Sequence, residues 1–122
     1  MAFMLTQLDE KDTPQAHWVP MRLRGLPELH LSQCFNYTDD FQALVWSVRI
    51  EPGGWILKYG MSRWDIGSSW DGDYKAKRRL RILAEAELRK DLFLFKNEKM
   101  PISSSMIVWI DSRGRVIPTE PR

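Results

Sequence analysis

The chain has 122 residues, of which 43% are hydrophobic and 28% are charged, and its formal net charge at neutral pH is +2. This length and composition predict one globular domain, residues 1–122, that buries a core without cross-links. The small net charge argues against a general attraction to nucleic acid or membranes. The single cysteine, Cys34, excludes an internal disulfide and a cysteine-based zinc cluster.

The first residues are predicted to form an arm. Residues 1–16 begin with a short apolar stretch and continue into a polar loop, so we interpret them as a short edge strand or a mobile arm. They contain no signal peptide, and no run in the chain is long enough to cross a bilayer, so we expect a cytoplasmic protein without a membrane partner. Residues 1–40 hold three of the 18 basic but six of the 16 acidic residues, which leaves a basic remainder.

Two strands are predicted next, at residues 17–23 and 29–35. Pro20 places the first of them at a sheet edge, because proline cannot donate to a strand ladder. Residues 36–40 have turn chemistry, and one helical turn is expected at 40–43.

The strongest local prediction is a β-hairpin. Large apolar residues alternate with other residues over 44–50 and again over 55–61, which is the period of strands with one buried face. Between them, residues 51–54 read Glu-Pro-Gly-Gly, a turn sequence. A Trp-rich loop is expected at residues 63–70.

One long helix is predicted from residue 73 to about residue 95. Its apolar stripe has helical spacing and is wide enough to lie on a sheet; it consists of Ala76, Leu80, Leu83, Ala84 and Leu88. Asp71 or Asp73 is expected to cap the first turn. Glu85 and Arg89 are expected to pair on the other side, and residues 92–95 are expected to be buried all round.

The remaining chain predicts a strand at 103–110, a turn at 111–114, a strand at 115–117 and a tail at 118–122. The expected fold is therefore α+β: a mainly antiparallel sheet of about five or six strands, with one principal long helix (about 73–95) packed on one face.

The most suggestive feature is a basic cluster of five residues at the start of this helix: Lys75, Lys77, Arg78, Arg79 and Arg81. A helix N-terminus is the positive end of the helix dipole, so positive charges are mildly unfavourable there. Their position indicates either a solvated face or a surface that meets something anionic.

Two tryptophans, Trp64 and Trp70, precede the cluster, with Arg63 beside the first. They are interpreted either as aromatic anchors at a protein interface or a stacking platform for bases, or as core rings folded back over the helix. Arg63, beside Trp64, is placed to form a cation–π contact in either case.

The order strand, turn, strand, loop, basic helix is similar to the second half of a double-stranded RNA-binding domain. Tyr74-Lys75-Ala76-Lys77-Arg78 corresponds in part to the basic run of that family's last helix. The helix that precedes the first strand in that family has no counterpart here, so membership is not assigned.

No enzyme chemistry is predicted. Asp65, Asp71 and Asp73 lack the spacing of a calcium loop and are expected to act in caps and turns. His30 and Cys34 share one side of a strand, without a visible means of activating a nucleophile. No cofactor and no metal are expected.

The predicted function is that of a small non-enzymatic binding protein of the regulator or inhibitor type, with the style of a phage or mobile-element accessory protein. It would engage an acidic partner protein through the basic cluster with Trp64, Trp70 and Arg63. The alternative is a nucleic-acid-binding protein that contacts phosphates with the same helix. Exposed strand edges also leave a homodimer open.

Overall fold

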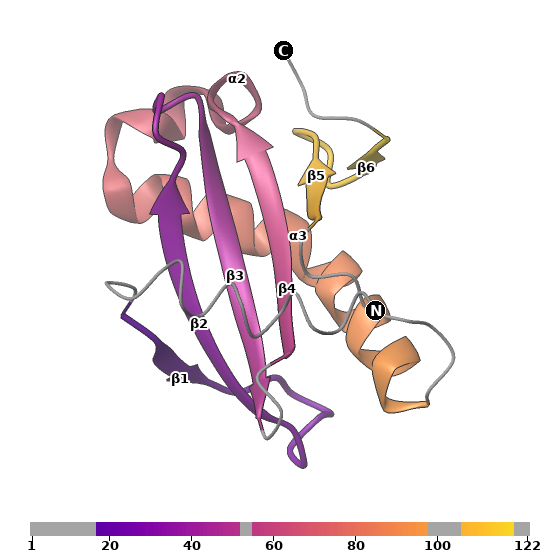
Figure 1. Cartoon of the computed structure of the whole chain (residues 1–122). Coiled ribbons are helices and arrows are strands. Elements are labelled where there is room, and N and C mark those ends of the chain that lie inside the picture. Colours follow the sequence, from indigo (N-terminus) through magenta and orange to yellow (C-terminus); the bar gives the residue numbers. More distant parts are fainter. Residues whose placement is uncertain (1–16, 52–54, 98–105, 119–122) are drawn as a thin grey trace.

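The computed structural model describes residues 17–51, 55–97 and 106–118. Within these ranges, six strands form one sheet in the order of the sequence, and one long helix crosses one of its faces (Figure 1). The fold is α+β, as predicted. The strands are β1 (Val19–Met21), β2 (His30–Tyr37), β3 (Ala43–Glu51), β4 (Trp55–Ser62), β5 (Ile107–Ile110) and β6 (Val116–Ile117), and the helical segments are α2 (Arg63–Ile66), η1 (Gly67–Asp71) and α3 (Asp73–Lys96).

The predicted hairpin is confirmed as β3 and β4. The two strands are antiparallel, and Trp46 is paired with Tyr59 and Val48 with Leu57. Alternate residues of a strand lie on the same face of the sheet. These four residues share the face that is covered by α3, and they belong to the core. The expected turn includes residues 52–54, which lie outside the described residues.

The long helix is also confirmed, since α3 runs from Asp73 to Lys96. Its buried side is Ala76, Leu80, Ala84, Leu88, Asp91 and Leu92, whereas Leu83 is only partly buried at the flank. The predicted cap is wrong: Gly72 is the N-cap, and no side chain accepts a hydrogen bond from the first turn of α3. The prediction that the last turn is buried all round is wrong for Phe93. This side chain is 60% exposed because it lies on the side of α3 that faces away from the core.

The Glu85–Arg89 ion pair is present, with 3.0 Å between Nε and Oε2. Arg89 also donates to the carbonyl oxygen of Arg24 at 2.7 Å. This side chain therefore ties α3 to the turn between β1 and β2.

The N-terminal strands differ from the prediction in their ends. β1 is only three residues long and contains Pro20, while β2 extends to Tyr37. The prediction of one helical turn at residues 40–43 is wrong. Instead, the hydroxyl of Thr38 accepts from the N–H of Ala43 at 3.1 Å, and Phe41 adopts a φ of 55° in a tight turn.

After α3 the chain returns to the sheet beside β4. β5 runs parallel to β4, with Tyr59 opposite Val108, and β6 is antiparallel to β5. The predicted turn is confirmed: the N–H of Gly114 donates to the carbonyl oxygen of Asp111 at 2.9 Å. Of the predicted last strands, residues 103–105 lie outside the described residues, as do the proposed arm (1–16) and most of the tail (119–122).

Candidate functional site

The Trp-rich segment is helical, which corrects the expected loop. The hydroxyl oxygen of Ser62 accepts from the backbone N–H of Asp65 at 3.2 Å and caps the short helix α2. Gly67 ends α2 with a φ of 65°, and η1 follows. Trp64 stands on this helical turn with 76% of its surface exposed.

Trp70 on η1 has a structural role. It is half buried, packs against the core, and meets the ring of Tyr37 edge-on with 5.2 Å between the ring centres. The guanidinium of Arg63 lies 5.5 Å from the centre of the Trp70 ring, which fits a cation–π contact. The structure therefore joins Arg63 to Trp70, whereas Trp64 is exposed.

Two members of the basic cluster lie on the flank of α3 that faces β2. The ammonium of Lys77 pairs with the carboxylate of Asp73 at 2.9 Å. Arg81 donates to Oε1 of Gln33 at 3.3 Å, and its guanidinium lies 5.8 Å from the ring of Trp46. The same amide oxygen accepts from the indole N–H of Trp46 at 2.8 Å, so Arg81 belongs to the packing between helix and sheet.

The start of α3 also carries a coupled pair of titratable groups. The hydroxyl of Tyr37 donates to Oδ1 of Asp73 at 2.8 Å. Partial burial, followed by the hydrogen bond and charge of Asp73, raises the pKa of Tyr37 to about 12. The hydrogen bond from Lys77, together with that from Tyr37, lowers the pKa of Asp73. Asp73 is thus held as an anion and partly neutralises the basic cluster.

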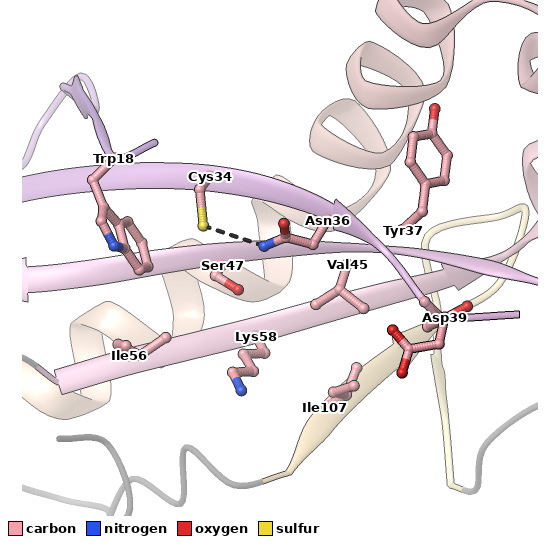
Figure 2. A pocket seen from close by; sticks show the side chains of 11 residues that line it. Trp18, Cys34, Asn36, Tyr37, Asp39, Val45, Ser47, Ile56, Lys58 and Ile107 are labelled. Carbon is pink, nitrogen blue, oxygen red and sulfur yellow. Dashed lines mark hydrogen bonds between the residues drawn. The ribbon is translucent and has the colours of Figure 1, made fainter. Parts of the chain in front are cut away.

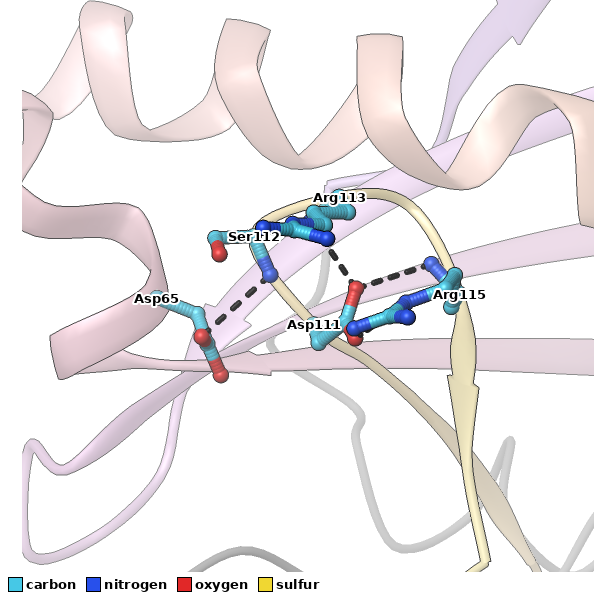
Figure 3. A network of polar contacts seen from close by, with 5 residues as sticks. All are labelled: Asp65, Asp111, Ser112, Arg113 and Arg115. Carbon is cyan, nitrogen blue, oxygen red and sulfur yellow. Dashed lines mark hydrogen bonds and ion pairs between the residues drawn. The ribbon is translucent and has the colours of Figure 1, made fainter.

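Arg79 is used internally as well. Its Nε donates to the carbonyl oxygen of Asp65 at 3.2 Å, which ties α3 to α2. The carboxylate of Asp65 accepts from the N–H of Ser112 at 3.2 Å in the turn between β5 and β6 (Figure 3). In that turn Asp111 accepts from the N–H groups of Arg113 and Arg115. This network fastens the C-terminal hairpin to the rest of the fold.

Lys75 and Arg78 remain on the outer side of α3. Both are exposed, and neither has a hydrogen bond or ion pair with another of the residues that the structure describes. They border an open groove of about 410 Å³ between α3 and η1, which is lined by Ser69, Tyr74, Lys75, Arg78, Arg79, Ile82 and Leu83.

Two residues of this groove were not predicted. Tyr74 is 76% exposed and Ile82 is 60% exposed, although both are large and apolar. With Arg78 they occupy positions i, i+4 and i+8, which form one line along a helix. Each residue of this line comes two positions before a residue of the buried stripe, which includes Ala76, Leu80 and Ala84. Two positions correspond to about half a helical turn, so the sequence itself indicates that Tyr74 and Ile82 lie on the exposed side.

The other candidates from the sequence do not form a site. His30 is exposed, and no hydrogen bond joins it to Cys34. In the described parts of the chain, no three His, Cys, Asp or Glu side chains gather in a way that could hold a metal ion. None of the described helices has the length and apolar character needed to cross a membrane.

Comparison with protein-family models, with curated proteins and with solved structures finds no match to this chain.

Proposed function

We propose that this protein is a non-enzymatic binding protein, of the regulator or inhibitor type, that holds an acidic segment of a partner protein in the groove on the outer side of α3. The observation that carries the proposal is the composition of this groove. It combines two basic side chains, Lys75 and Arg78, that have no internal ion pair among the described residues with the exposed apolar surfaces of Tyr74 and Ile82.

Exposed apolar side chains that gather at one place on a soluble domain mark sites of contact with other molecules. Tyr and Arg are also the residue types that contribute most of the free energy at protein interfaces. A partner segment that fits would carry Asp or Glu residues opposite Lys75 and Arg78, and an aliphatic or aromatic residue between Tyr74 and Ile82. Trp64, exposed on the neighbouring α2, extends the available apolar surface.

The same groove favours a protein partner over nucleic acid. Three of the five basic residues, Lys77, Arg79 and Arg81, are already paired with groups of the protein itself. Two remaining charges would release few counterions from a phosphate backbone, so the electrostatic gain would be small. The free thiol of Cys34 supports a cytoplasmic location, which is part of this proposal.

The experiment is a selection of random peptides displayed on phage, followed by measurement of affinity with the synthesised peptides. We expect enriched peptides to combine Asp or Glu with Leu, Ile or aromatic residues. The variant Lys75→Glu/Arg78→Glu should lose at least about tenfold in affinity, because it replaces attraction by repulsion.

The matched control is Arg22→Glu/Lys90→Glu, which changes the formal charge by the same amount at exposed positions that do not line the groove. It should bind the peptides like the wild type. Equal loss in both double variants would contradict the groove as the site. Salt-sensitive binding to mixed-sequence DNA or RNA, lost only in the groove variant, would replace the protein partner by a nucleic acid.

A further inference from the structure

The turn between β2 and β3 displays an aromatic ring in a strained backbone conformation. Phe41 has a φ of 55° and is the one residue other than glycine with a positive φ among those that the structure describes. Bulky residues disfavour this region, which glycine and asparagine adopt more readily. The ring is also 61% exposed. Stability alone would favour a small or polar residue here, whereas strain and exposure together are typical of residues that contact another molecule.

The turn that carries this ring is held by its own hydrogen bonds. The hydroxyl of Thr38 donates to Oδ1 of Asp40 at 2.7 Å, and the N–H of Gln42 donates to the same oxygen at 3.1 Å. The N–H of Phe41 donates to the carbonyl oxygen of Thr38 at 2.8 Å. The rings of Phe41 and Tyr37 lie 5.8 Å apart, centre to centre. Because the ring is already fixed in place, a contact through it loses little ordering entropy.

Two carboxylates accompany the ring. Asp39 is exposed, and it makes no hydrogen bond or ion pair with the other residues that the structure describes. Figure 2 shows its carboxylate at a pocket of about 320 Å³ on the sheet face opposite α3, on the other side of the strand end from the ring of Tyr37. The hydrogen bond from Thr38 lowers the pKa of Asp40, which is therefore ionised at neutral pH. The turn thus presents two negative charges next to one apolar ring.

This combination is complementary to the groove on the outer side of α3. The groove offers the positive charges of Lys75 and Arg78. The exposed apolar surfaces of Tyr74 and Ile82 lie in the same groove. Residues 39–41 read Asp-Asp-Phe, which is the chemistry of an acidic segment with an aromatic residue. The turn does not line the groove of its own chain, so only the turn of another copy can enter it.

The turn and the groove lie at the same end of the molecule (Figure 1). Tyr37 joins them, because its ring contacts Phe41 while its hydroxyl donates to Asp73 in the first turn of α3. Two copies that meet by this end can be related by a twofold axis, which places each turn in the groove of the other copy. The same contact is then made twice, and the buried area is doubled.

We propose that the groove binds the turn between β2 and β3 of a second copy of this chain, so that the protein is a twofold dimer until a partner segment displaces the turn. This inference rests on the proposed function, because it uses the same groove and the same ligand chemistry. It adds a means of regulation: the dimer and the complex with a partner exclude each other. Partner binding therefore weakens as the concentration of the protein rises.

The first experiment measures the mass of the protein by sedimentation equilibrium, between about 10 μM and 1 mM of chain and at low and high salt. We expect a monomer–dimer equilibrium that shifts toward the monomer in high salt, because the contact pairs opposite charges. Phe41→Asn should weaken dimerisation at least about tenfold. It should keep the turn, because asparagine adopts a positive φ with little strain.

A charge exchange tests the contact directly. Asp39→Lys and Lys75→Glu should each weaken dimerisation alone, because each places like charges together. Mixed in equal amounts, the two variants should form a heterodimer at least about tenfold tighter than either homodimer. In the heterodimer the new lysine meets the new glutamate, and the second contact keeps its native charges. The matched control is Glu51→Lys, an equal change to that at Asp39 but at the opposite end of β3, which should dimerise like the wild type.

A protein that is monomeric at about 1 mM in low salt would overturn the inference. So would a mixture of the charge variants that associates no better than each alone, or a dimer that persists when a peptide selected for the groove is bound. These results leave the proposed function standing, because the peptide selection tests it separately. If no peptide is selected but the charge-exchanged mixture associates, the partner is contradicted and the dimer is retained. If Phe41→Asn fails to fold, the charge exchange decides the question.

Discussion

On one face of the sheet, α3 packs over large apolar side chains such as Leu44, Trp46 and Val48, all completely buried. All three belong to β3, and the residues that alternate with them on the other face of the sheet are the smaller Ala43, Val45 and Ser47. The first face is a continuous core. The second has a row of polar groups and a pocket. The difference shows that the largest side chains of β3 lie under α3, while the opposite face carries smaller side chains around a pocket.

The largest expected effect of a substitution lies on the face under α3. Leu80→Ala removes a completely buried side chain and leaves a cavity, which typically lowers the free energy of unfolding by about 2–5 kcal/mol. Urea unfolding followed by circular dichroism measures the change. Ile82→Ala, on the exposed side of the same helix, is the control. A similar loss in both variants would contradict the assignment of the core.

A medium effect is expected on the opposite face, where Gly60 lies beneath Trp109. A Cβ at Gly60 would stand 2.7 Å from Cζ3 of Trp109, which is too close for any side chain. Gly60→Ala should therefore destabilise by about 1–3 kcal/mol through overpacking. Gly60→Ala should cost less in a Trp109→Leu background than in the wild type, because the closest atoms belong to Trp109. An equal cost in both backgrounds would show that the contact with Trp109 is not its cause.

The smallest effect on stability depends on pH and concerns Asp91, on the buried side of α3. Its carboxylate accepts from the hydroxyl of Tyr59 at 2.7 Å, and burial raises its pKa in the folded state. The folded protein then binds this proton more tightly than the unfolded chain. The stabilising contribution is complete below the ordinary pKa near 3.8 and is lost as the pH rises through the folded pKa.

Asp91→Asn cannot titrate, so it lacks this contribution. We expect the wild type to gain stability relative to the variant as the pH falls from 7 toward 4, as measured by urea unfolding at several pH values. The other titratable groups are shared and cancel in the difference. Parallel curves for the two proteins would show that Asp91 has the same pKa in both states.

The parts of the fold that the sequence predicts are those with long, regular periods. The alternation over β3 and β4 and the apolar stripe of α3 each extend over several repeats, so both elements are evident without the structure. The Ser62-to-Asp65 spacing is a helix-capping signal for the short helix α2, so the sequence does contain evidence against the expected loop at residues 63–70. By contrast, no local sequence pattern indicates that β5 pairs with β4 in parallel.

The candidate site was predicted only in part. Lys75 and Arg78 lie in the groove, but Lys77, Arg79 and Arg81 serve the fold. Their roles depend on where Gln33 and Asp65 come to lie beside α3, which no local pattern contains. On the face opposite α3, the row of paired residues Cys34, Ser47 and Lys58 depends in the same way on strand register.

The parallel pairing of β5 with β4 also determines the order in which the fold can form. The strands β1 to β4 are joined by short connections, so they can associate through local contacts alone. β5 reaches β4 only after α3 has crossed the sheet, which closes a much longer loop and makes this pairing slow. The C-terminal hairpin is therefore expected to dock late in folding and to be among the first parts to open locally.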